Sequence, residues 1–448
     1  MKTAREVVLL TLSACEKEGA WAGAYLSGAL RQEGISGKEG ALALRLCYGV
    51  LQNRMLCDFY ISEFCTVPLR KLERMVLNAL RLGAYQLLFL DKIPESAAVN
   101  ESVKLVKKYS KNPKSAGLVN AVLRTMVRNQ DHLPEVTGKN RIWQLSVQYS
   151  HPEWFVKEMY MRLGTEELEA FLRANNTEAP LSLQINPLKT DLETLQEKLE
   201  LHRKGQVHPW LENCLELRQS GGPEQLDGWA QGLFWIQDPA AKLAVMAASP
   251  QKGWRVLDAC SAPGGKSFAA AAQMKNIGQI QACDIHSRKL KLVQEGANRL
   301  GFSCIQTEVQ DAGAFRAEWA DQFNLVIADL PCSGMGVIRK KPDIRYHDPE
   351  PMKMLPKVQE HLLDCLSRYV KPGGVLLYST CTVLKRENED VVASFLADHP
   401  AFDLEGFSLP CPYGEAKEGM ITLWPQRQGT DGFFISRMRK KDKGVIDD

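Results

Sequence analysis

The chain has no paired cysteine motif and no long apolar run, and each absence excludes a class of protein. Its 12 cysteines are scattered over 448 residues without a C-x-x-C pair, which argues against a disulfide framework, a zinc site and a thioredoxin-like motif. We therefore expect no metal and reduced thiols, as in a cytoplasmic protein. No stretch reaches the roughly 18 uninterrupted apolar residues of a membrane span. With 45% hydrophobic and 24% charged residues, the composition predicts an ordinary soluble globular protein, which we expect to be a monomer without a membrane partner.

The net charge of +3 is small but unevenly distributed. Residues 1–140 hold 20 Lys and Arg against 13 Asp and Glu, whereas the remainder holds 36 against 40. From Lys104 to Arg128 there are seven basic residues and no acid. Such a stretch is either a solvated helix face or a surface that contacts phosphates, and both interpretations stay open. Any electrostatic attraction to nucleic acid should therefore be strongest in the N-terminal part.

The apolar pattern predicts three domains. Residues 1–135 have helical periodicity only, interrupted by glycine and proline, and predict a bundle of six or seven helices. Residues 140–245 mix helical patterns with short strands and predict a small α+β connector. Residues 246–448 alternate strands and helices, which is typical of a doubly wound, Rossmann-like α/β domain.

The last domain carries the strands that matter for function. Five apolar runs predict parallel strands, namely Arg255–Ala259, Gln279–Asp284, Ser303–Glu308, Asn324–Asp329 and Gly374–Ser379. Two further runs, Ile421–Leu423 and Gly432–Ser436, predict an antiparallel hairpin at the sheet edge. Ligands of open α/β sheets bind outside the carboxyl ends of the strands, so the residues that follow these runs are the candidates for a site.

A glycine turn and three acids occupy such positions. Pro263-Gly264-Gly265-Lys266 follows the first strand and opens a helix, but it is neither G-x-G-x-x-G nor a P-loop, which disfavours dinucleotides and nucleoside triphosphates. Asp284, Asp311 and Asp329 end or follow three successive strands. A carboxylate after the second strand can accept both hydroxyls of a ribose. One such acid is commonly a helix cap, but three beside a glycine turn favour an adenosyl ligand.

Two cysteines also follow strand ends. Cys332 comes after Leu325–Asp329, and Cys381 comes after Gly374–Ser379. A thiolate is a strong nucleophile at neutral pH even when only a small fraction is ionised. Cytosine carbon 5 is too electron-poor to accept a methyl cation unaided, whereas addition of a thiolate at carbon 6 makes carbon 5 enamine-like. The two thiols therefore predict methylation of cytosine through a covalent cysteine adduct.

Several stretches resemble the RNA (cytosine-5)-methyltransferase family that includes the Sun/Fmu and NOP2-type proteins. They are Asp258–Lys266, Asp329–Gly334, Ser379–Thr382, Glu387-Asn388-Glu389 and Asp431–Phe434. The helical N-terminus, which ends in Asn120–Arg124, is similar to the NusB antitermination fold. Two departures are Ser261, where the family often has Ala, and Gln428, where His is expected.

The resemblance implies roles for individual residues. Cys381 would be the nucleophile, Cys332 would help to release the product, and Asp329 would contact the cytosine. The S-adenosylmethionine contacts would come from Cys260, Ser261, Ala262, Pro263, Gly264, Gly265, Lys266, Asp284, Asp311 and Asp329. The implied substrate is small-subunit (16S) ribosomal RNA, naked or at an early stage of assembly, with the NusB-like domain as an RNA-binding module.

Two other functions stay open. A DNA cytosine-5 methyltransferase also carries a Pro-Cys after a strand and would use Cys332 as the nucleophile; the second cysteine, Cys381, argues against it. A non-catalytic antitermination or ribosome assembly factor would carry a vestigial methyltransferase domain. The intact Asp329, both cysteines and the glycine turn argue against such decay.

Overall fold

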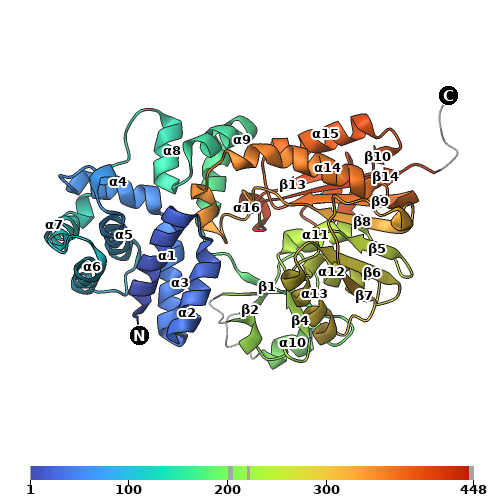
Figure 1. Cartoon of the computed structure of the whole chain (residues 1–448), viewed down its shortest axis with the longest axis horizontal. Helices are drawn as coiled ribbons and strands as arrows, with labels where there is room; N and C mark the ends of the chain where they lie inside the picture. The colour runs from blue at the N-terminus through green and yellow to red at the C-terminus, as the bar shows by residue number, and fades with distance from the viewer. Residues whose placement is uncertain (1, 200–204, 219–221, 443–448) are drawn as a thin grey trace. The chain divides into compact units, whose positions relative to one another are not determined.

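The computed structural model describes residues 2–199, 205–218 and 222–442 (Figure 1). They form two compact units, of which unit 1 is Met1–Thr177 with Ile338–His347, and unit 2 is Glu178–Val337 with Asp348–Asp448. Compact units follow contacts rather than sequence patterns, so the domain limits 1–135, 140–245 and 246–448 stay a prediction. In the described part of the chain, no helix is both long and apolar enough to cross a membrane.

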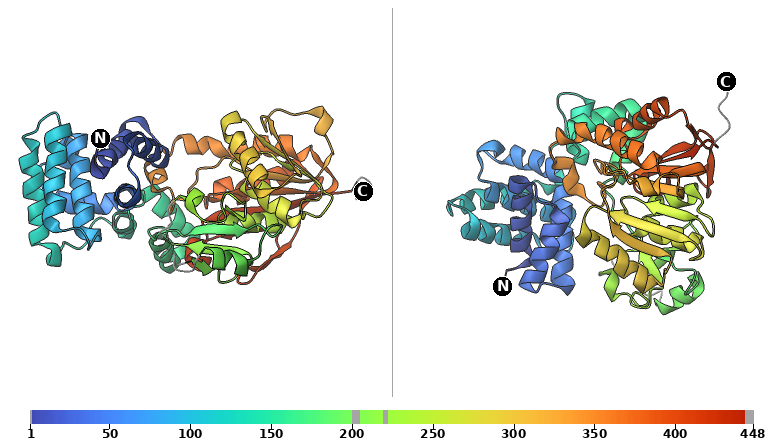
Figure 2. Two further views of the ribbon diagram at one scale, coloured as in Figure 1. Left: turned by 90° about the horizontal axis from the view of Figure 1, so that it is seen from below. Right: turned by 45° about the vertical axis from the view of Figure 1, so that its right-hand side comes forward.

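Unit 1 is helical, as predicted (Figure 2). Its first seven helices are α1 (Ala4–Glu18), α2 (Ala22–Glu33), α3 (Gly37–Gln52), α4 (Arg54–Phe64), α5 (Arg74–Phe89), α6 (Glu95–Tyr109) and α7 (Ser115–Arg128). They are followed by α8 (Arg141–Tyr149) and α9 (Glu153–Ala174). The apolar α5 is the central helix of the bundle, because it packs on α1, α3, α4, α6 and α7.

The smaller sheet of unit 2 is antiparallel. Its strands are β1 (Leu181–Ile185), β2 (Gly205–Val207), β3 (Cys214–Leu217) and β4 (Phe234–Ile236), in the order β2-β3-β1-β4. The helix α10 (Leu192–Lys198) adds Leu195 to its apolar core. The two strands predicted for this region, at 181–185 and 233–236, are both present.

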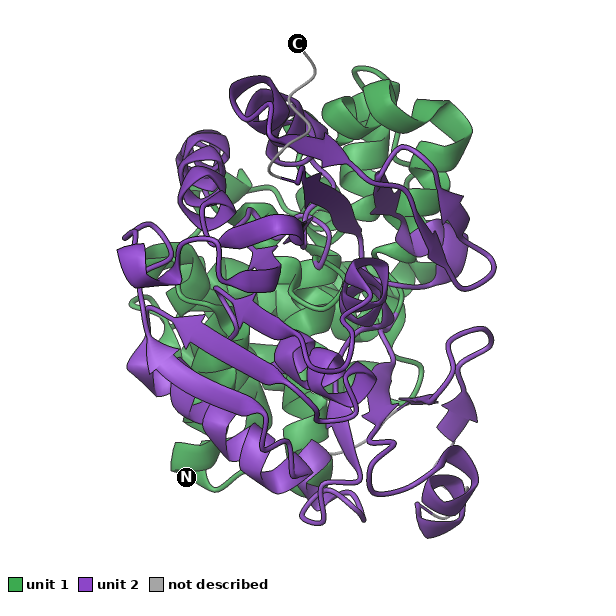
Figure 3. Cartoon of the chain, turned by 90° about the vertical axis from the view of Figure 1, so that its right-hand side faces the viewer, with its two compact units in different colours: residues 1–177, 338–347 green, residues 178–337, 348–448 purple. Residues whose placement is uncertain are grey.

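The larger sheet lies within unit 2, which is drawn in purple in Figure 3. Its order is β10-β14-β9-β8-β5-β6-β7, and β13 pairs with β14. The parallel strands are β5 (Arg255–Asp258), β6 (Gln279–Asp284), β7 (Ile305–Val309), β8 (Phe323–Asp329) and β9 (Val370–Thr380). The antiparallel strands are β10 (Phe402–Leu404), β13 (Met420–Leu423) and β14 (Phe433–Lys440). A separate hairpin joins β11 (Phe407–Leu409) to β12 (Gly414–Ala416).

The predicted hairpin at 421–436 is present, but its position in the sheet differs. The strand β14 lies between β9 and β10 instead of at the edge. Its residues 433–438 are nearly all buried, with Phe434 and Met438 on one face and Phe433 and Ile435 on the other. An apolar strand buried on both faces belongs inside a sheet, which is the physical reason for the difference.

Helices cover both faces of the larger sheet. Val256, Ile327 and Leu377 face the core formed with α11 (Pro239–Ala248), α12 (Gly265–Gln273) and α13 (Ser287–Leu300). The alternate residues Leu257 and Val326 face α14 (Leu355–Ser367) and α15 (Glu389–Asp398). With both faces covered, polar ligands can reach the sheet only at the strand ends, where β5, β6, β8 and β9 all terminate in the same direction.

Candidate active site

The two candidate cysteines meet at the carboxyl ends of neighbouring strands. Asp329 at the end of β8 pairs in register with Ser379 of β9, and a cysteine follows in each loop. The Sγ atoms of Cys332 and Cys381 are 3.0 Å apart, and both side chains are half-buried. The structure thus brings together two residues that lie far apart in the sequence, at the edge where the strand pattern predicts a site.

The electrostatics of the pair favour a proton on Cys332. The contact with the Cys381 thiol, burial and the nearby charge of Glu387 raise the pKa of Cys332 well above its usual range. A protonated Cys332 can donate a hydrogen bond to the Cys381 sulfur. A thiolate at Cys381 would be stabilised by this donor.

Asp329 lies beside the cysteines with two donors on its carboxylate. The Ser379 hydroxyl donates to Oδ1 at 2.8 Å, and the Lys266 ammonium donates to Oδ2 at 2.5 Å. Lys266 is buried and also lies over the Phe433 ring, 5.1 Å from its centroid. The predicted cofactor loop and the predicted cytosine contact are therefore joined by one ion pair.

Seven of the ten residues predicted to bind the cofactor form one loop and the start of α12. One residue after the end of β5, the loop and helix start contain in sequence Cys260, Ser261, Ala262, Pro263, Gly264, Gly265 and Lys266. The Ser261 N–H donates to the carbonyl of Cys283 at 2.7 Å, which ties the loop to β6. Gly264 has φ of 111°, and a Cβ there would lie 2.4 Å from the Phe268 ring. Only glycine fits this turn.

The structure leaves polar atoms of this loop available to a ligand. The buried atoms Asp258 Oδ1 and Ser261 Oγ have no hydrogen-bond partner within the described residues, although Asp258 Oδ2 accepts from the Ser267 hydroxyl at 2.6 Å. Burial raises the pKa of Asp258 to about 7. Orphaned buried polar atoms beside a glycine turn fit a polar cofactor such as S-adenosylmethionine.

The two remaining acids lie at the same edge. Asp284 ends β6, is half-buried, and accepts a hydrogen bond on Oδ1 from the backbone N–H of His286 at 2.8 Å. Asp311 follows β7, is exposed, and accepts from the N–H of Gly313 at 2.9 Å. Each of the two carboxylates thus uses one of its oxygens to close a local turn. Gln428, the second departure from the family pattern, is the last residue of the short helix α16 (Pro425–Gln428).

Sequence reasoning missed the residues that hold the two cysteine loops. The Gly336 N–H donates to the carbonyl of Cys381 at 3.0 Å, and the Gly432 N–H donates to the carbonyl of Gly336 at 2.9 Å. A Cβ on Gly336 would lie 1.9 Å from the Gly432 oxygen. Gly432 was noted only as part of the stretch Asp431–Phe434, and neither glycine carries a pattern that predicts this approach. Glu387 and Asn388, noted only as part of a motif, also lie beside these loops.

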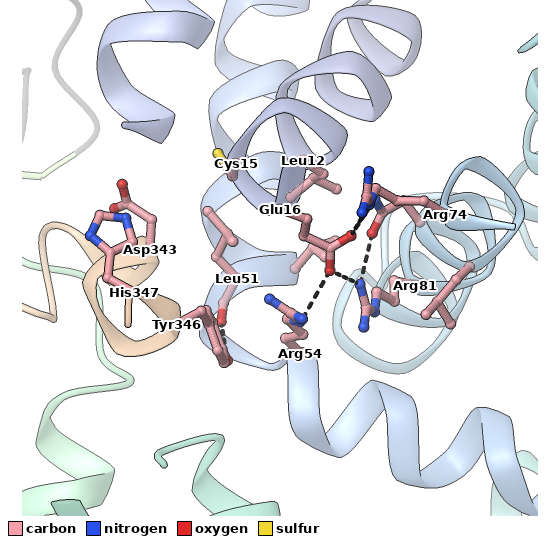
Figure 4. Close-up of a pocket in the computed structure, with 13 residues that line it drawn as sticks. Leu12, Cys15, Glu16, Leu51, Arg54, Arg74, Arg81, Asp343, Tyr346 and His347 are labelled. Atoms are coloured by element: carbon pink, nitrogen blue, oxygen red, sulfur yellow. Dashed lines mark hydrogen bonds and ion pairs between the residues drawn. The ribbon is translucent and has the colours of Figure 1, made fainter. Parts of the chain in front are cut away.

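Unit 1 contains a cavity of about 360 Å³ that involves none of the predicted site residues (Figure 4). Arg54, Arg74 and Arg81 line it, and each of them pairs with an acid. Glu16 lies 2.9 Å from Arg54 and 2.5 Å from Arg81, and Asp58 lies 2.6 Å from Arg81. These ion pairs join α1, α4 and α5, so they explain the cluster as part of the helical bundle.

Models of known protein families match three successive parts of the chain. The model of the 16S rRNA methyltransferase RsmB/F family matches residues 245–439, and the NusB family model matches residues 2–128. A model of the ferredoxin-like domain of RsmF/B-like methyltransferases matches residues 151–222. The predicted fold class, a NusB-like helical domain, a small α+β domain and a Rossmann-like methyltransferase domain, is confirmed.

The similar proteins extend over nearly the whole chain. The "Probable ribosomal RNA small subunit methyltransferase B" of Bacillus subtilis is 34% identical and covers 98% of both chains. The "Ribosomal RNA small subunit methyltransferase B" of Erwinia tasmaniensis is 32% identical over 92% of both. Among solved structures, that of PH0851 has a TM-score of 0.80 with 25% identity and covers 98% of this chain and 99% of its own. A methyltransferase homolog protein from Pyrococcus horikoshii, 24% identical with a TM-score of 0.58 over 68% of this chain and 100% of its own, shares the fold.

Proposed function

The chain belongs to the RsmB/F family of ribosomal RNA small-subunit methyltransferases, and we propose that it methylates carbon 5 of a cytosine through a covalent cysteine adduct. S-adenosylmethionine is the proposed donor and supplies the methyl group when bound. The observation that carries the proposal is the 3.0 Å contact between the sulfurs of Cys332 and Cys381 next to Asp329. A single thiol would suffice for attack on the cytosine. A second thiol in contact with the first therefore supports a second chemical step in which it takes part.

In the first step the Cys381 thiolate adds to carbon 6 of the cytosine. The new S–C6 bond moves the electrons of the C5=C6 double bond onto carbon 5. Those electrons would form the bond to the methyl group while the S–CH3 bond of the bound donor breaks and its electron pair stays on the donor sulfur. Cys332, which keeps its proton because its pKa is raised, donates a hydrogen bond that stabilises the Cys381 thiolate before it attacks.

The ion pair of Lys266 and Asp329 is the proposed contact to the cytosine ring. Addition at carbon 6 develops negative charge toward ring nitrogen 3, and a proton there stabilises the adduct. The Asp329 carboxylate, oriented by the Lys266 ammonium on its Oδ2, can accept a hydrogen bond from that N–H next to the ring. The Ser379 hydroxyl fixes the other carboxylate oxygen and hence the direction of the group.

In the second step the product is released. After methyl transfer, carbon 5 carries both the methyl group and its original hydrogen. The hydrogen leaves as a proton to a base, its electrons restore the C5=C6 bond, and the S–C6 bond breaks to expel Cys381 as a thiolate. A Cys332 S–H within 3.0 Å of that sulfur assists this departure. Cys381 is thus indispensable for attack, whereas Cys332 becomes indispensable only at release.

Nucleoside analysis tests this proposal. The full-length protein is incubated with methyl-labelled S-adenosylmethionine and naked small-subunit RNA, assembled small subunits or duplex DNA, and each product is digested to nucleosides. We expect label in 5-methylcytidine from naked RNA, with Cys381→Ala as the inactive control. Label in another nucleoside would contradict the cytosine assignment. Label in the DNA instead of the RNA would favour the DNA methyltransferase alternative.

A further inference from the structure

Glu387 holds the backbone on both sides of Cys332, on one side directly and on the other through Gln359. Its Oε2 accepts a hydrogen bond from the N–H of Ser333 at 2.8 Å and from the Gln359 side-chain amide at 3.2 Å. The same amide nitrogen of Gln359 donates to the carbonyl of Pro331 at 2.9 Å. The residues before and after Cys332 are therefore held by one carboxylate, directly at Ser333 and through Gln359 at Pro331.

Asn388 contacts the residues on both sides of Cys381 in the same manner. Its Oδ1 accepts a hydrogen bond from the Thr380 hydroxyl at 2.6 Å, and its Nδ2 donates to the carbonyl of Thr382 at 3.0 Å. An amide suits this position because it offers an acceptor and a donor at once. Two consecutive residues thus each hold a different cysteine loop.

The two sets of contacts belong to one buried network. The hydroxyls of Ser333 and Thr382 lie 2.9 Å apart, and the Tyr378 hydroxyl donates to the carbonyl of Glu387 at 2.5 Å. Glu387 and Asn388 are both completely buried, with 0% of their surface exposed. Displacement of either side chain should therefore move one sulfur relative to the other.

A buried carboxylate at this position is costly. Burial raises the pKa of Glu387, and its Oε1 is buried without a hydrogen-bond partner within the described residues. Buried charges usually contribute little to stability, and an unpaired buried oxygen lowers it. The cost of burying Glu387 is better explained by a role in the geometry of Cys332 than by stability of the fold.

We propose that Glu387 and Asn388 are separate positioning residues, Glu387 for Cys332 in product release and Asn388 for Cys381 in attack. The inference rests on the two-cysteine mechanism proposed above. It goes beyond that mechanism because it assigns opposite kinetic phenotypes to two neighbouring side chains. If the two residues served only to stabilise the fold, replacing them would lower the rates of attack and release together, in parallel with the stability of the protein.

Adduct formation under single-turnover conditions separates the two roles. Each variant is mixed with radiolabelled RNA and S-adenosylmethionine, and the covalent protein–RNA complex is followed on denaturing gels. Glu387→Ala should accumulate the complex at least about tenfold above wild type, because release is slowed more than attack. Asn388→Ala should slow formation of the complex at least about tenfold without accumulation, because the nucleophile is misplaced.

The Cys332→Ala background sharpens the comparison. There, release is already blocked, so adding Glu387→Ala should leave the rate of adduct formation unchanged, whereas adding Asn388→Ala should still lower it. Asp390→Ala is the matched control, since Asp390 is an exposed acid in the first turn of the same helix, α15, and pairs with Lys385. It should behave as wild type.

A conservative variant covers the case in which Glu387→Ala does not fold. Glu387→Gln keeps an oxygen that can accept from Ser333 but removes the charge that helps to raise the pKa of Cys332. Without this charge Cys332 loses its proton at a lower pH and can then no longer assist release. The pH above which the adduct accumulates should therefore shift downward. An unshifted profile, or equal losses of both steps in the Glu387 and Asn388 variants, overturns the inference. If Cys332→Ala itself forms no adduct, the proposed two-cysteine mechanism fails instead.

Discussion

Asp284 ends β6 with a half-buried carboxylate at the edge where the cofactor loop begins. If it holds the ribose hydroxyls, Asp284→Ala should weaken S-adenosylmethionine binding by about 1.5–3 kcal/mol, the usual range for hydrogen bonds to a charged group. Calorimetric titration of the free protein measures this directly. Asp284→Asn separates the effect of losing the charge from the effect of losing the local turn. Its amide oxygen can still accept a hydrogen bond from the His286 N–H. Unchanged affinity in Asp284→Ala removes this residue from the site.

Asp258 predicts a pH dependence of stability. Its folded pKa of about 7 lies above the ordinary 3.8, so between these values the folded protein holds a proton that the unfolded chain has lost. The resulting stability is fully present below about pH 4 and is lost as pH rises to about 7. Asp258→Asn is neutral throughout and keeps an acceptor for Ser267. Its unfolding free energy relative to wild type should rise between about pH 4 and pH 7, by at most about 4 kcal/mol.

Thermal or urea unfolding of ligand-free protein at several pH values checks this expectation. Two neighbouring groups oppose the shift, since the Ser267 hydroxyl bonds the carboxylate and Lys266 carries a positive charge, whereas Asp329 and Asp284 add to it. Parallel stability curves for Asp258→Asn and wild type would show that Asp258 is ionised in the folded state.

At the scale of single residues, the sequence predicted which side chains gather but not how they are oriented. Strand ends and turn chemistry located Cys332, Cys381 and Asp329, because the carboxyl ends of parallel strands share one edge of a sheet. The ion pair of Lys266 with Asp329 was not predicted. Lys266 is the second residue of α12, and only the packed structure determines where its long side chain ends.

Among the elements, α6 and α7 carry the acid-free basic stretch. Lys108 already pairs with Glu6 of α1. Reversing the charge of Lys108 would therefore test the stability of the fold rather than RNA binding. The exposed Lys107, Lys111 and Lys114 are better targets. If they contact phosphates, changing all three to Glu should weaken RNA binding and reduce the slope of log affinity against log salt by about 2. Filter binding over a salt series measures both quantities.

A charge-matched control distinguishes a contact surface from a general effect of net charge. Lys252, Lys275 and Lys417 are exposed lysines of unit 2, and changing them to Glu alters the net charge equally. This control should keep most of the salt slope. Equal slopes for both triple variants and wild type would mean that the stretch is only a solvated helix face.

Strands were easier to predict than helix ends. The run Gln279–Asp284 matches β6 at both ends, because short apolar runs between turn residues have few alternatives. The break between α3 and α4 was missed, since Asn53 interrupts the helix without glycine or proline. Its side-chain amide donates to the carbonyl of Gly49 at 2.9 Å. A side chain that competes in this way for backbone hydrogen bonds gives only a weak signal in the sequence.

On the scale of the whole chain, the order of the domains was predictable, but the assignment of one segment was not. Ile338–His347 belongs to unit 1, although the residues before and after it belong to unit 2. Arg345 explains this, because its buried guanidinium donates to the carbonyls of Ser150 and Asn175, among others, in unit 1. Backbone carbonyls that accept from a distant arginine leave no trace in the sequence pattern.

The account of the whole enzyme depends on the order in which it uses its two thiols. The deciding measurement is denaturing gel electrophoresis of Cys381→Ala and Cys332→Ala after incubation with radiolabelled small-subunit RNA and S-adenosylmethionine. We expect no covalent complex and no methylation from Cys381→Ala. We expect Cys332→Ala to accumulate a shifted, protease-sensitive band, because attack and transfer proceed but release does not. A shifted band from Cys381→Ala and none from Cys332→Ala would contradict the assignment and make Cys332 the nucleophile.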